Sequence, residues 1–270
     1  MKRREFLTAG AAAAVTGILA NEGELLLAEE CPTAKRELIE VRILYTQSED
    51  AKKRLLDRCD ALLIPRCREM GFRKTGIFSV NLELHKEDKG FDPIYENAVF
   101  FMTSAPCFGK LEAFHEALHT IADADKRIQT FTKEALYTEM ESTLMRAFPH
   151  CPTLEVPNLS PDRVVQFRRY FSPSCDRNRS KRNMFDVRGE LDLFKRCGMM
   201  PVFFGEMLYG TMMPNISYVL SFENDEARRA NWKKFVTSPE WKQMSSEPEF
   251  ADTATKIRNL FLKPSAGSEI

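Results

Sequence analysis

The sequence lacks an excess of either charge and lacks a long apolar segment. Its 270 residues include 39 lysines and arginines and 39 aspartates and glutamates, and blocks of one sign are short. This balance excludes the basic surface typical of nucleic-acid-binding proteins, so a neutral small molecule or another protein is the expected partner. The apolar run from Thr8 to Ala20 is too short and too weakly hydrophobic to predict a membrane span.

Cysteines are present, but not in the patterns that hold metals, and histidine is confined to the first part of the chain. The seven cysteines lack the Cys-x-x-Cys spacing of a zinc ribbon or a redox pair. Most are therefore expected to be buried apolar thiols, and Cys59 and Cys67 lie too far apart on a predicted helix for a direct disulfide. All four histidines precede Cys151, which leaves the second half of the chain without the usual acid–base side chain.

The composition is that of a globular protein, with 43% hydrophobic and 29% charged residues. This excludes collagen-like, disordered and disulfide-scaffold proteins, and the length allows one large domain or two small ones.

The N-terminus resembles a twin-arginine export signal. Residues 3–7 read Arg-Arg-Glu-Phe-Leu and precede the mild apolar run. We expect residues 1–30 to direct export to the periplasm or cell envelope, with cleavage near Ala20 or Ala28. An uncleaved signal would tether the protein to the membrane, and a charged N-terminal helix of a cytoplasmic protein is the alternative.

The rest of the chain contains one pattern twice. The predicted strands are residues 37–46, 72–80, 95–103 and 138–148, then 162–171, 201–210, 215–223 and 255–262. The predicted helices are residues 48–71, 109–122, 178–199 and 225–236, and glycines at 71 and 198 end two of them.

The order strand, helix, strand, strand, helix, strand is that of a ferredoxin-like fold. We therefore predict an α+β protein with two tandem ferredoxin-like halves, at residues 37–148 and 162–264. Each half would be an antiparallel sheet with helices on one face, and the open faces of the two sheets would pack together. The proline-rich residues 149–161 form the predicted linker.

The second copy resembles the NIPSNAP family. The likeness rests on the strand VVQFRRYF, on the stretch from Gly189 to Met244 with its Arg-x-x-x-Trp helix, and on the closing NLFLKP. It covers most of Val164 to Pro264 and is weaker over residues 38–148. The resemblance implies a dimeric α/β-barrel type of fold and a possible homo-oligomer. It implies no particular reaction, because the family has no agreed one.

One motif suggests a metal. His115, Glu116 and His119 have the H-E-x-x-H order of a zinc peptidase. Such a site needs a third ligand and an enclosed cleft, the metzincin continuation is absent, and no spacing fixes Glu134, Glu139 or Glu141 as that ligand. We expect a helix with a polar flank, no metal and no cofactor, with a zinc hydrolase as an alternative. The methionines of residues 199–213 fit a packed sheet or apolar pocket better than a copper site.

A candidate ligand site comes from the alternation along strand 162–171. Gln166, Arg168 and Tyr170 share one side, and we expect this side to face the other half or a partner chain while the apolar side meets the helices. Arg168 could hold a carboxylate or enolate, although a structural ion pair with Glu190 or Glu206 is favoured. The candidate ligand-binding residues are Arg168, Tyr170, Phe204, Glu206, Tyr209 and Trp232.

Two functions fit these patterns. The first is a binding module of the cell envelope for a small molecule or a protein, without established catalysis. The second is a cofactor-independent oxygenase, isomerase or lyase that acts on a small aromatic or keto compound. The absence of histidine from the second half favours the binding module, although Glu206 or Tyr209 could serve an enzyme.

The export signal predicts the location of a fused reporter. Residues 1–30 fused to a folded reporter should move it out of the cytosol, and replacing Arg3 and Arg4 with lysine should stop this movement. Cell fractionation measures the outcome. A reporter that stays in the cytosol with the native arginines would contradict the prediction.

Overall fold

The computed structural model describes residues 35–72, 74–124 and 136–270, and of residues 117–124 it describes the backbone alone. No helix in these ranges is long and apolar enough to cross a membrane. The predicted export signal and Glu134 lie outside the described residues.

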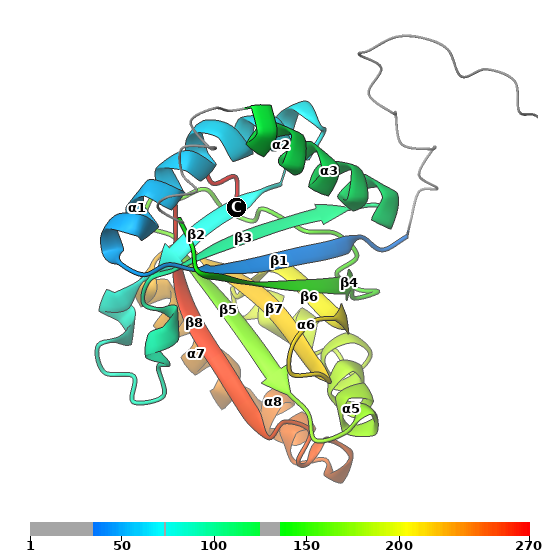
Figure 1. The fold of residues 1–270 in the computed structure, drawn as a ribbon. Coiled ribbons are helices and arrows are strands. Elements are labelled where there is room, and N and C mark those ends of the chain that lie inside the picture. Colours follow the sequence, from blue (N-terminus) through cyan, green and yellow to red (C-terminus); the bar gives the residue numbers. More distant parts are fainter. Residues whose placement is uncertain (1–34, 73, 125–135) are drawn as a thin grey trace, which may run out of the picture.

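Eight strands of the described ranges form one closed antiparallel barrel (Figure 1). The order around it is β1-β3-β2-β8-β5-β7-β6-β4, and β4 pairs with β1 to close the ring. The strands are β1 Leu38–Tyr45, β2 Gly76–Val80, β3 Ala98–Ala105, β4 Glu139–Ala147, β5 Val164–Phe171, β6 Met200–Tyr209, β7 Asn215–Phe222 and β8 Lys256–Pro264. Each strand predicted from the sequence is present, with ends that differ by a few residues.

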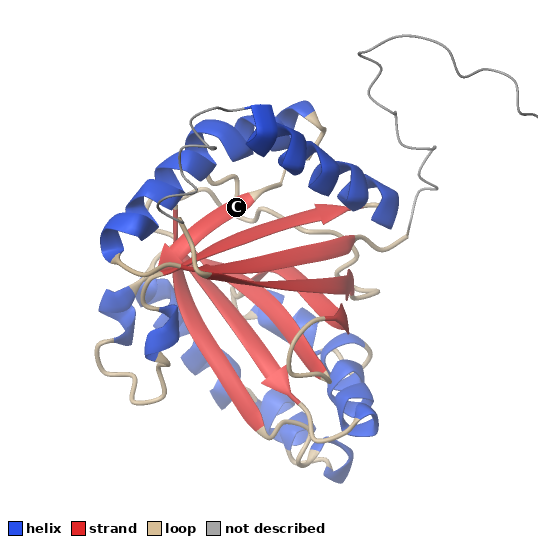
Figure 2. Ribbon diagram, in the orientation of Figure 1, coloured by secondary structure: helices blue, strands red, loops and turns tan. Residues whose placement is uncertain are grey.

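The helices lie outside the barrel (Figure 2). Those of the first half are α1 Glu49–Arg58, a π-helical turn Cys59–Leu63, α2 Ile64–Glu69 and α3 Phe108–Ala124. Those of the second half are α5 Cys175–Asp186, α6 Glu190–Arg196, α7 Asp225–Thr237 and α8 Pro239–Ser245. Short 3-10 turns occur at Leu82–His85, Pro93–Tyr95 and Pro248–Phe250. The sequence pattern did not predict α8.

Local signals in the sequence set the helix ends. Four N-cap side chains each accept a hydrogen bond from the backbone N–H three residues later, and they are Ser48, Ser174, Asn224 and Ser238. Gly71 and Gly198 have φ angles of 76° and 84°, as expected for glycines that end helices.

The sheets differ from the expectation in how they meet. We predicted that the open faces of the two sheets pack together, and in the structure β2 also pairs with β8 and β4 with β6, so that the sheet edges join. Closure gives the strand edges backbone partners that separate sheets would leave unpaired. At the seam between β4 and β6, a Cβ on Gly205 would lie 2.6 Å from the Met145 Sδ. The glycine therefore makes room for Met145 in the core.

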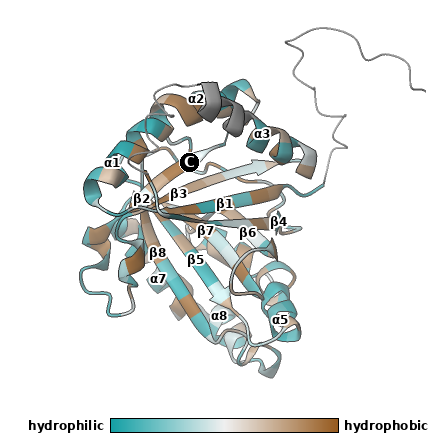
Figure 3. Ribbon diagram, viewed as in Figure 1, coloured by the Kyte–Doolittle hydropathy of each residue, from teal (hydrophilic) through white to brown (hydrophobic). Residues whose placement is uncertain are grey.

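The barrel interior is filled by apolar side chains from both halves. They form one buried cluster that includes Ile39, Val41, Ile43, Phe78, Phe100, Met145, Val165, Phe167, Val219 and Leu260. Phe100 and Phe167 meet edge-to-face at a centroid distance of 6.2 Å. Hydrophobic and hydrophilic residues are mixed along the strands (Figure 3), because alternate side chains point in and out.

This alternation corrects the predicted orientation of β5. Val165 and Phe167 point into the barrel, whereas Tyr170 packs against Phe185 of α5 and Arg168 lies over Trp232 of α7. The interior of an eight-stranded barrel is just wide enough for side chains to fill, and here they fill it. The compact apolar residues therefore fill it, and the long polar ones lie beneath the helices.

Candidate functional site

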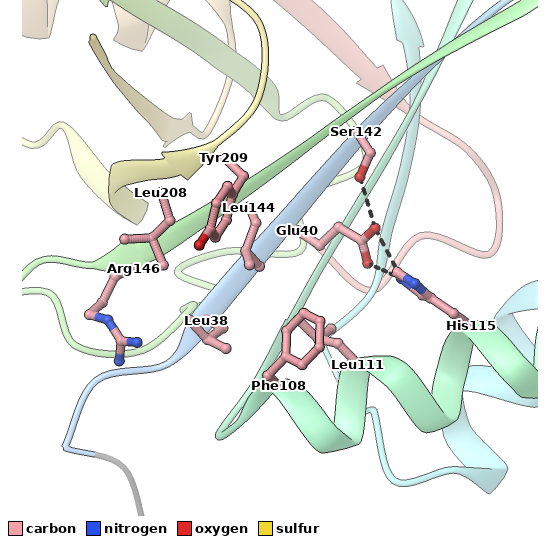
Figure 4. A pocket seen from close by; sticks show the side chains of 10 residues that line it. All are labelled: Leu38, Glu40, Phe108, Leu111, His115, Ser142, Leu144, Arg146, Leu208 and Tyr209. Carbon is pink, nitrogen blue, oxygen red and sulfur yellow. Dashed lines mark hydrogen bonds and ion pairs between the residues drawn. The ribbon is translucent and has the colours of Figure 1, made fainter. Parts of the chain in front are cut away.

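A cavity of about 790 Å³ lies on the outside of the barrel, between elements of the first half and the end of β6 (Figure 4). It is bounded by the start of α3, the outward faces of β1 and β4, and the end of β6. Its lining residues are Leu38, Glu40, Phe108, Leu111, His115, Ser142, Leu144, Arg146, Leu208 and Tyr209.

The cavity lies between the apolar face of α3 and the outward faces of β1 and β4, on which apolar and polar side chains alternate. Leu111 and Phe114 are buried against the barrel, as the helical periodicity predicted. On β1 and β4 the outward positions alternate between apolar and polar side chains, since Leu38 pairs in register with Arg146 and Glu40 with Leu144. Phe108 and Tyr209 are exposed at the rim. The result is an apolar space with a few polar groups.

A buried carboxylate forms the polar end of this cavity. Glu40 is 2% exposed and accepts hydrogen bonds from Arg42 Nε at 2.6 Å and Ser142 Oγ at 3.2 Å. The His115 Nε2 lies 3.1 Å from its second oxygen, as Figure 4 shows. These three donors satisfy a group that would be costly to bury alone.

The electrostatics keep Glu40 charged. Burial raises the pKa of its carboxyl, but the Arg42 guanidinium and the His115 ring outweigh burial and hold the pKa below its usual 4.5. Because an ionised carboxylate can only accept, Nε2 of His115 must carry the proton in this contact. With the proton on Nε2, an uncharged ring would have a free lone pair on Nδ1, which is what a base at the cavity requires.

The structure does not gather the six predicted ligand residues around one cavity. Arg168, Tyr170, Phe204 and Trp232 belong to the packed layer between the second half of the barrel and its helices. In that layer Phe204 stacks on Tyr218 at a centroid distance of 4.5 Å. Their role in ligand binding stays a prediction.

The other two candidates lie elsewhere. Glu206 is on β6, where it pairs with Arg182 and lies 3.7 Å from Arg36. Tyr209 lines the cavity beside Leu208. Of the six predicted residues, Tyr209 alone shares this cavity with Glu40 and His115.

The predicted ion pair of Arg168 does not form at salt-bridge distance, although the charges of Arg168 and Glu190 attract each other. Glu190 is buried and pairs with Lys181 at 3.2 Å, and Glu206 is held by the arginines just described. Arg168 instead places its guanidinium 4.6 Å from the Trp232 ring centroid and 5.3 Å from that of Tyr170. Stacking on rings is favourable for a weakly hydrated guanidinium in an aromatic layer, although the Arg168 Nε is buried there without a hydrogen-bond partner among the described residues.

Sequence reasoning missed Glu40, Ser142 and Arg146. The period-two rule already places Glu40 and Arg42 on one face of strand 37–46, which is the signal that was available. What the sequence did not show was that His115 contacts this strand.

His115 is not the solvated flank residue that the helical pattern suggested. Its contact with a buried carboxylate means that replacing it should cost more than a surface substitution. Within the described residues, no group of three or more histidine, cysteine, aspartate or glutamate side chains is placed to hold a metal ion. The side chain of His119 lies outside the described residues, so the zinc alternative stays untested.

The cysteines agree with the expectation of buried thiols. Cys59, Cys67, Cys151 and Cys197 are free and buried, and Cys175 is free and exposed. Burial raises the pKa of the Cys67 thiol to about 11, which makes it unreactive at neutral pH. Cys107 is in a disulfide.

Comparison with known proteins supports part of the resemblance seen in the sequence. Residues 183–269 match the sequence model of the NIPSNAP family. This segment lies within the second half and overlaps most of the stretch that carries the resemblance. No curated protein matches the chain.

Solved structures share the fold at low sequence identity. A protein from Lactobacillus acidophilus NCFM named as a candidate monooxygenase has 11% identity and a TM-score of 0.54, over 85% of this chain and 94% of its own. An anthrone oxidase-like protein has 9% identity and a TM-score of 0.52, over 87% and 95% of the two chains. A candidate monooxygenase from Fusobacterium nucleatum has 8% identity and a TM-score of 0.54, over 85% and 93%. These similarities establish the mixed α/β barrel fold.

The buried carboxylate predicts a stability change. Replacing Glu40 with glutamine removes a charge that Arg42 and His115 stabilise, and the free energy of unfolding in urea should fall by about 2 kcal/mol. The control Glu49→Gln removes a carboxylate that pairs with Lys52 but is 75% exposed, and it should change stability by less than about 0.5 kcal/mol.

Glu40 should also contribute to the loss of folding stability at acidic pH. Because the pKa of folded Glu40 is lowered, its contribution is present above the unfolded pKa of about 4.3 and is lost as the pH falls through the folded value. Glu40→Gln should therefore lose less stability than the native protein between pH 5 and pH 3. Equal stability of the two proteins at pH 7 would contradict the account of this site.

Proposed function

We propose that this chain is an exported binding module that holds a small, largely apolar ligand in the cavity between α3, β1 and β4. The observation that carries this proposal is the cavity itself, an apolar space of about 790 Å³ with a satisfied polar group at one end. Ligand sites in proteins commonly have this size and this mixture of apolar walls and few convergent polar groups. The NIPSNAP match of residues 183–269 supports a binding role.

The proposal includes the parts of the sequence prediction that concern export and domain organisation. Export rests on the arginine pair at residues 3 and 4, and the disulfide at Cys107 supports it, because such bonds persist in oxidising compartments. The tandem organisation is supported by strand order, since both β4-β1-β3-β2 and β8-β5-β7-β6 follow the ferredoxin-like order. Residues 149–161 would then link the halves, and association with a second copy stays a prediction.

The cavity predicts binding of a neutral apolar probe. N-phenyl-1-naphthylamine, which fluoresces strongly in apolar surroundings, should bind the native protein. Leu144→Trp should weaken this binding at least about tenfold, because the larger side chain occupies the space between β4 and α3. The matched control Leu159→Trp places the same ring at a position that is 66% exposed, and it should bind like the native protein.

Thermal unfolding of both variants checks that they are folded. If Leu144→Trp is folded and binds the probe as tightly as the native protein, the probe does not occupy this cavity, and the proposed site is wrong.

A second candidate function is proton transfer to or from a small aromatic ketone or phenol, without a cofactor. The contact between Glu40 and His115 favours it, because a carboxylate on Nε2 orients the ring and stabilises the imidazolium that forms when Nδ1 takes a proton. On a ketone, the C–H bond next to the carbonyl would break, its proton would pass to Nδ1, and its electron pair would form the enolate. The names of the neighbours in fold, candidate monooxygenases and an anthrone oxidase-like protein, agree with a substrate of this class.

Hydrogen exchange tests this second function. In D₂O the native protein should accelerate deuterium incorporation next to the carbonyl of 2-tetralone, followed by NMR. His115→Gln should lose about 100-fold of that acceleration, the lower range for a general base. The control Arg229→Gln changes a residue that is 73% exposed on α7 and should leave the rate unchanged. Equal rates in the native protein and His115→Gln would exclude His115 as the base.

A further inference from the structure

We infer that the ligand of this cavity is an apolar acid, a molecule whose anionic group pairs with Arg146 while its hydrocarbon body lies along β1 and β4. The inference rests on the proposed function and names the class of ligand. It changes the expectation of a neutral ligand that the balanced charge of the whole chain suggested.

Arg146 is the cation of the cavity. It lies on the outward face of β4, opposite Leu38 in register, and its side chain is half-buried at the end of the cavity away from His115 (Figure 4). Within the described residues it makes no hydrogen bond and no ion pair with another side chain. A guanidinium in a partly apolar setting usually has an anionic partner, and a bound anion would supply one.

The carboxylate that could neutralise Arg146 is already engaged. Glu206 faces Arg146 in the register of β4 and β6. It nevertheless pairs with Arg182 and lies 3.7 Å from Arg36, which also donates to the carbonyl of Ala147. Two other arginines therefore hold the carboxylate next to Arg146, and Arg146 is left without a carboxylate within 4 Å among the described residues.

The opposite end of the cavity would repel an anion. Glu40 is ionised there, and its oxygens are occupied by Arg42, Ser142 and His115. An anionic ligand can therefore bind in one direction only, with its charge at Arg146. The remaining lone pair of His115 would accept a hydrogen bond from a hydroxyl at the far end of the ligand.

The spacing of these groups sets the length of the ligand. Ser142 and Arg146 are four residues apart on β4, which corresponds to about 13 Å along the strand. Leu144 lies between them on the same face, with Leu38 and Leu111 beside it. A chain of about ten carbons, or two fused rings that carry a third ring, would span most of this distance.

Two probes that share one body test the inference. 1-Anilinonaphthalene-8-sulfonate and N-phenyl-1-naphthylamine have the same ring system, and only the first carries an anionic group. The native protein should bind the sulfonate more tightly. Arg146→Gln should weaken sulfonate binding about tenfold while changing the neutral probe less than about twofold, since one charge-assisted contact is lost.

Three controls accompany this measurement. Arg229→Gln makes the same change of charge on exposed α7 and should leave the preference for the sulfonate intact. Arg146→Lys keeps the charge and should restore part of the affinity. Thermal unfolding should show that all three variants are folded.

The two probes separate failure of this inference from failure of the proposed function. If the neutral probe binds and Leu144→Trp blocks it, but Arg146→Gln leaves sulfonate binding unchanged, the cavity stands and the ligand class is wrong. If Leu144→Trp blocks neither probe, the cavity is not their site, and both the proposed function and this inference fail.

Discussion

The filled interior of the barrel is the constraint on which the rest of the structure depends. The inward side chains of the eight strands fill the space that the strands enclose, and the apolar residues of β1 and β5 point into this space. A ligand cavity can then form only outside, between the barrel and its helices. The cavity beneath α3 satisfies this condition, whereas in the second half aromatic side chains such as Phe204 and Phe194 fill the corresponding layer.

The same constraint moves polar side chains to the outer layer, where each must find a partner. Glu40 and Gln166 are both buried on outward positions, and each is satisfied differently. Glu40 accepts hydrogen bonds from Arg42, Ser142 and His115. Gln166 accepts a hydrogen bond from the Trp232 indole and donates one to Asn259. In the first half, the contacts of Glu40 leave an ion pair beside an open cavity. In the second half, the hydrogen bonds of Gln166 stabilise a packed layer without such a cavity. The two halves therefore share a strand order but differ in the side chains that lie beneath their helices.

The sequence predicted the elements well because local rules determine them. Periodicity together with Gly71 and Gly198 placed the predicted strands and helices within a few residues. The sequence did not predict the features that depend on contacts between residues far apart in the chain. The side of β5 that meets the helices depends on which face fits the barrel interior, and the partner of His115 depends on how α3 lies over β1. A single sequence carries no direct signal for the contact between Glu40 and His115, which are 75 residues apart.

The central claim is that a ligand binds outside the barrel, between Arg146 and His115. A crystal structure of the protein with 1-anilinonaphthalene-8-sulfonate tests it most directly. We predict density for the rings between α3 and Leu144, with the sulfonate within hydrogen-bonding distance of the Arg146 guanidinium. Density for the probe inside the barrel, or at another surface with this cavity unaltered, would contradict the account.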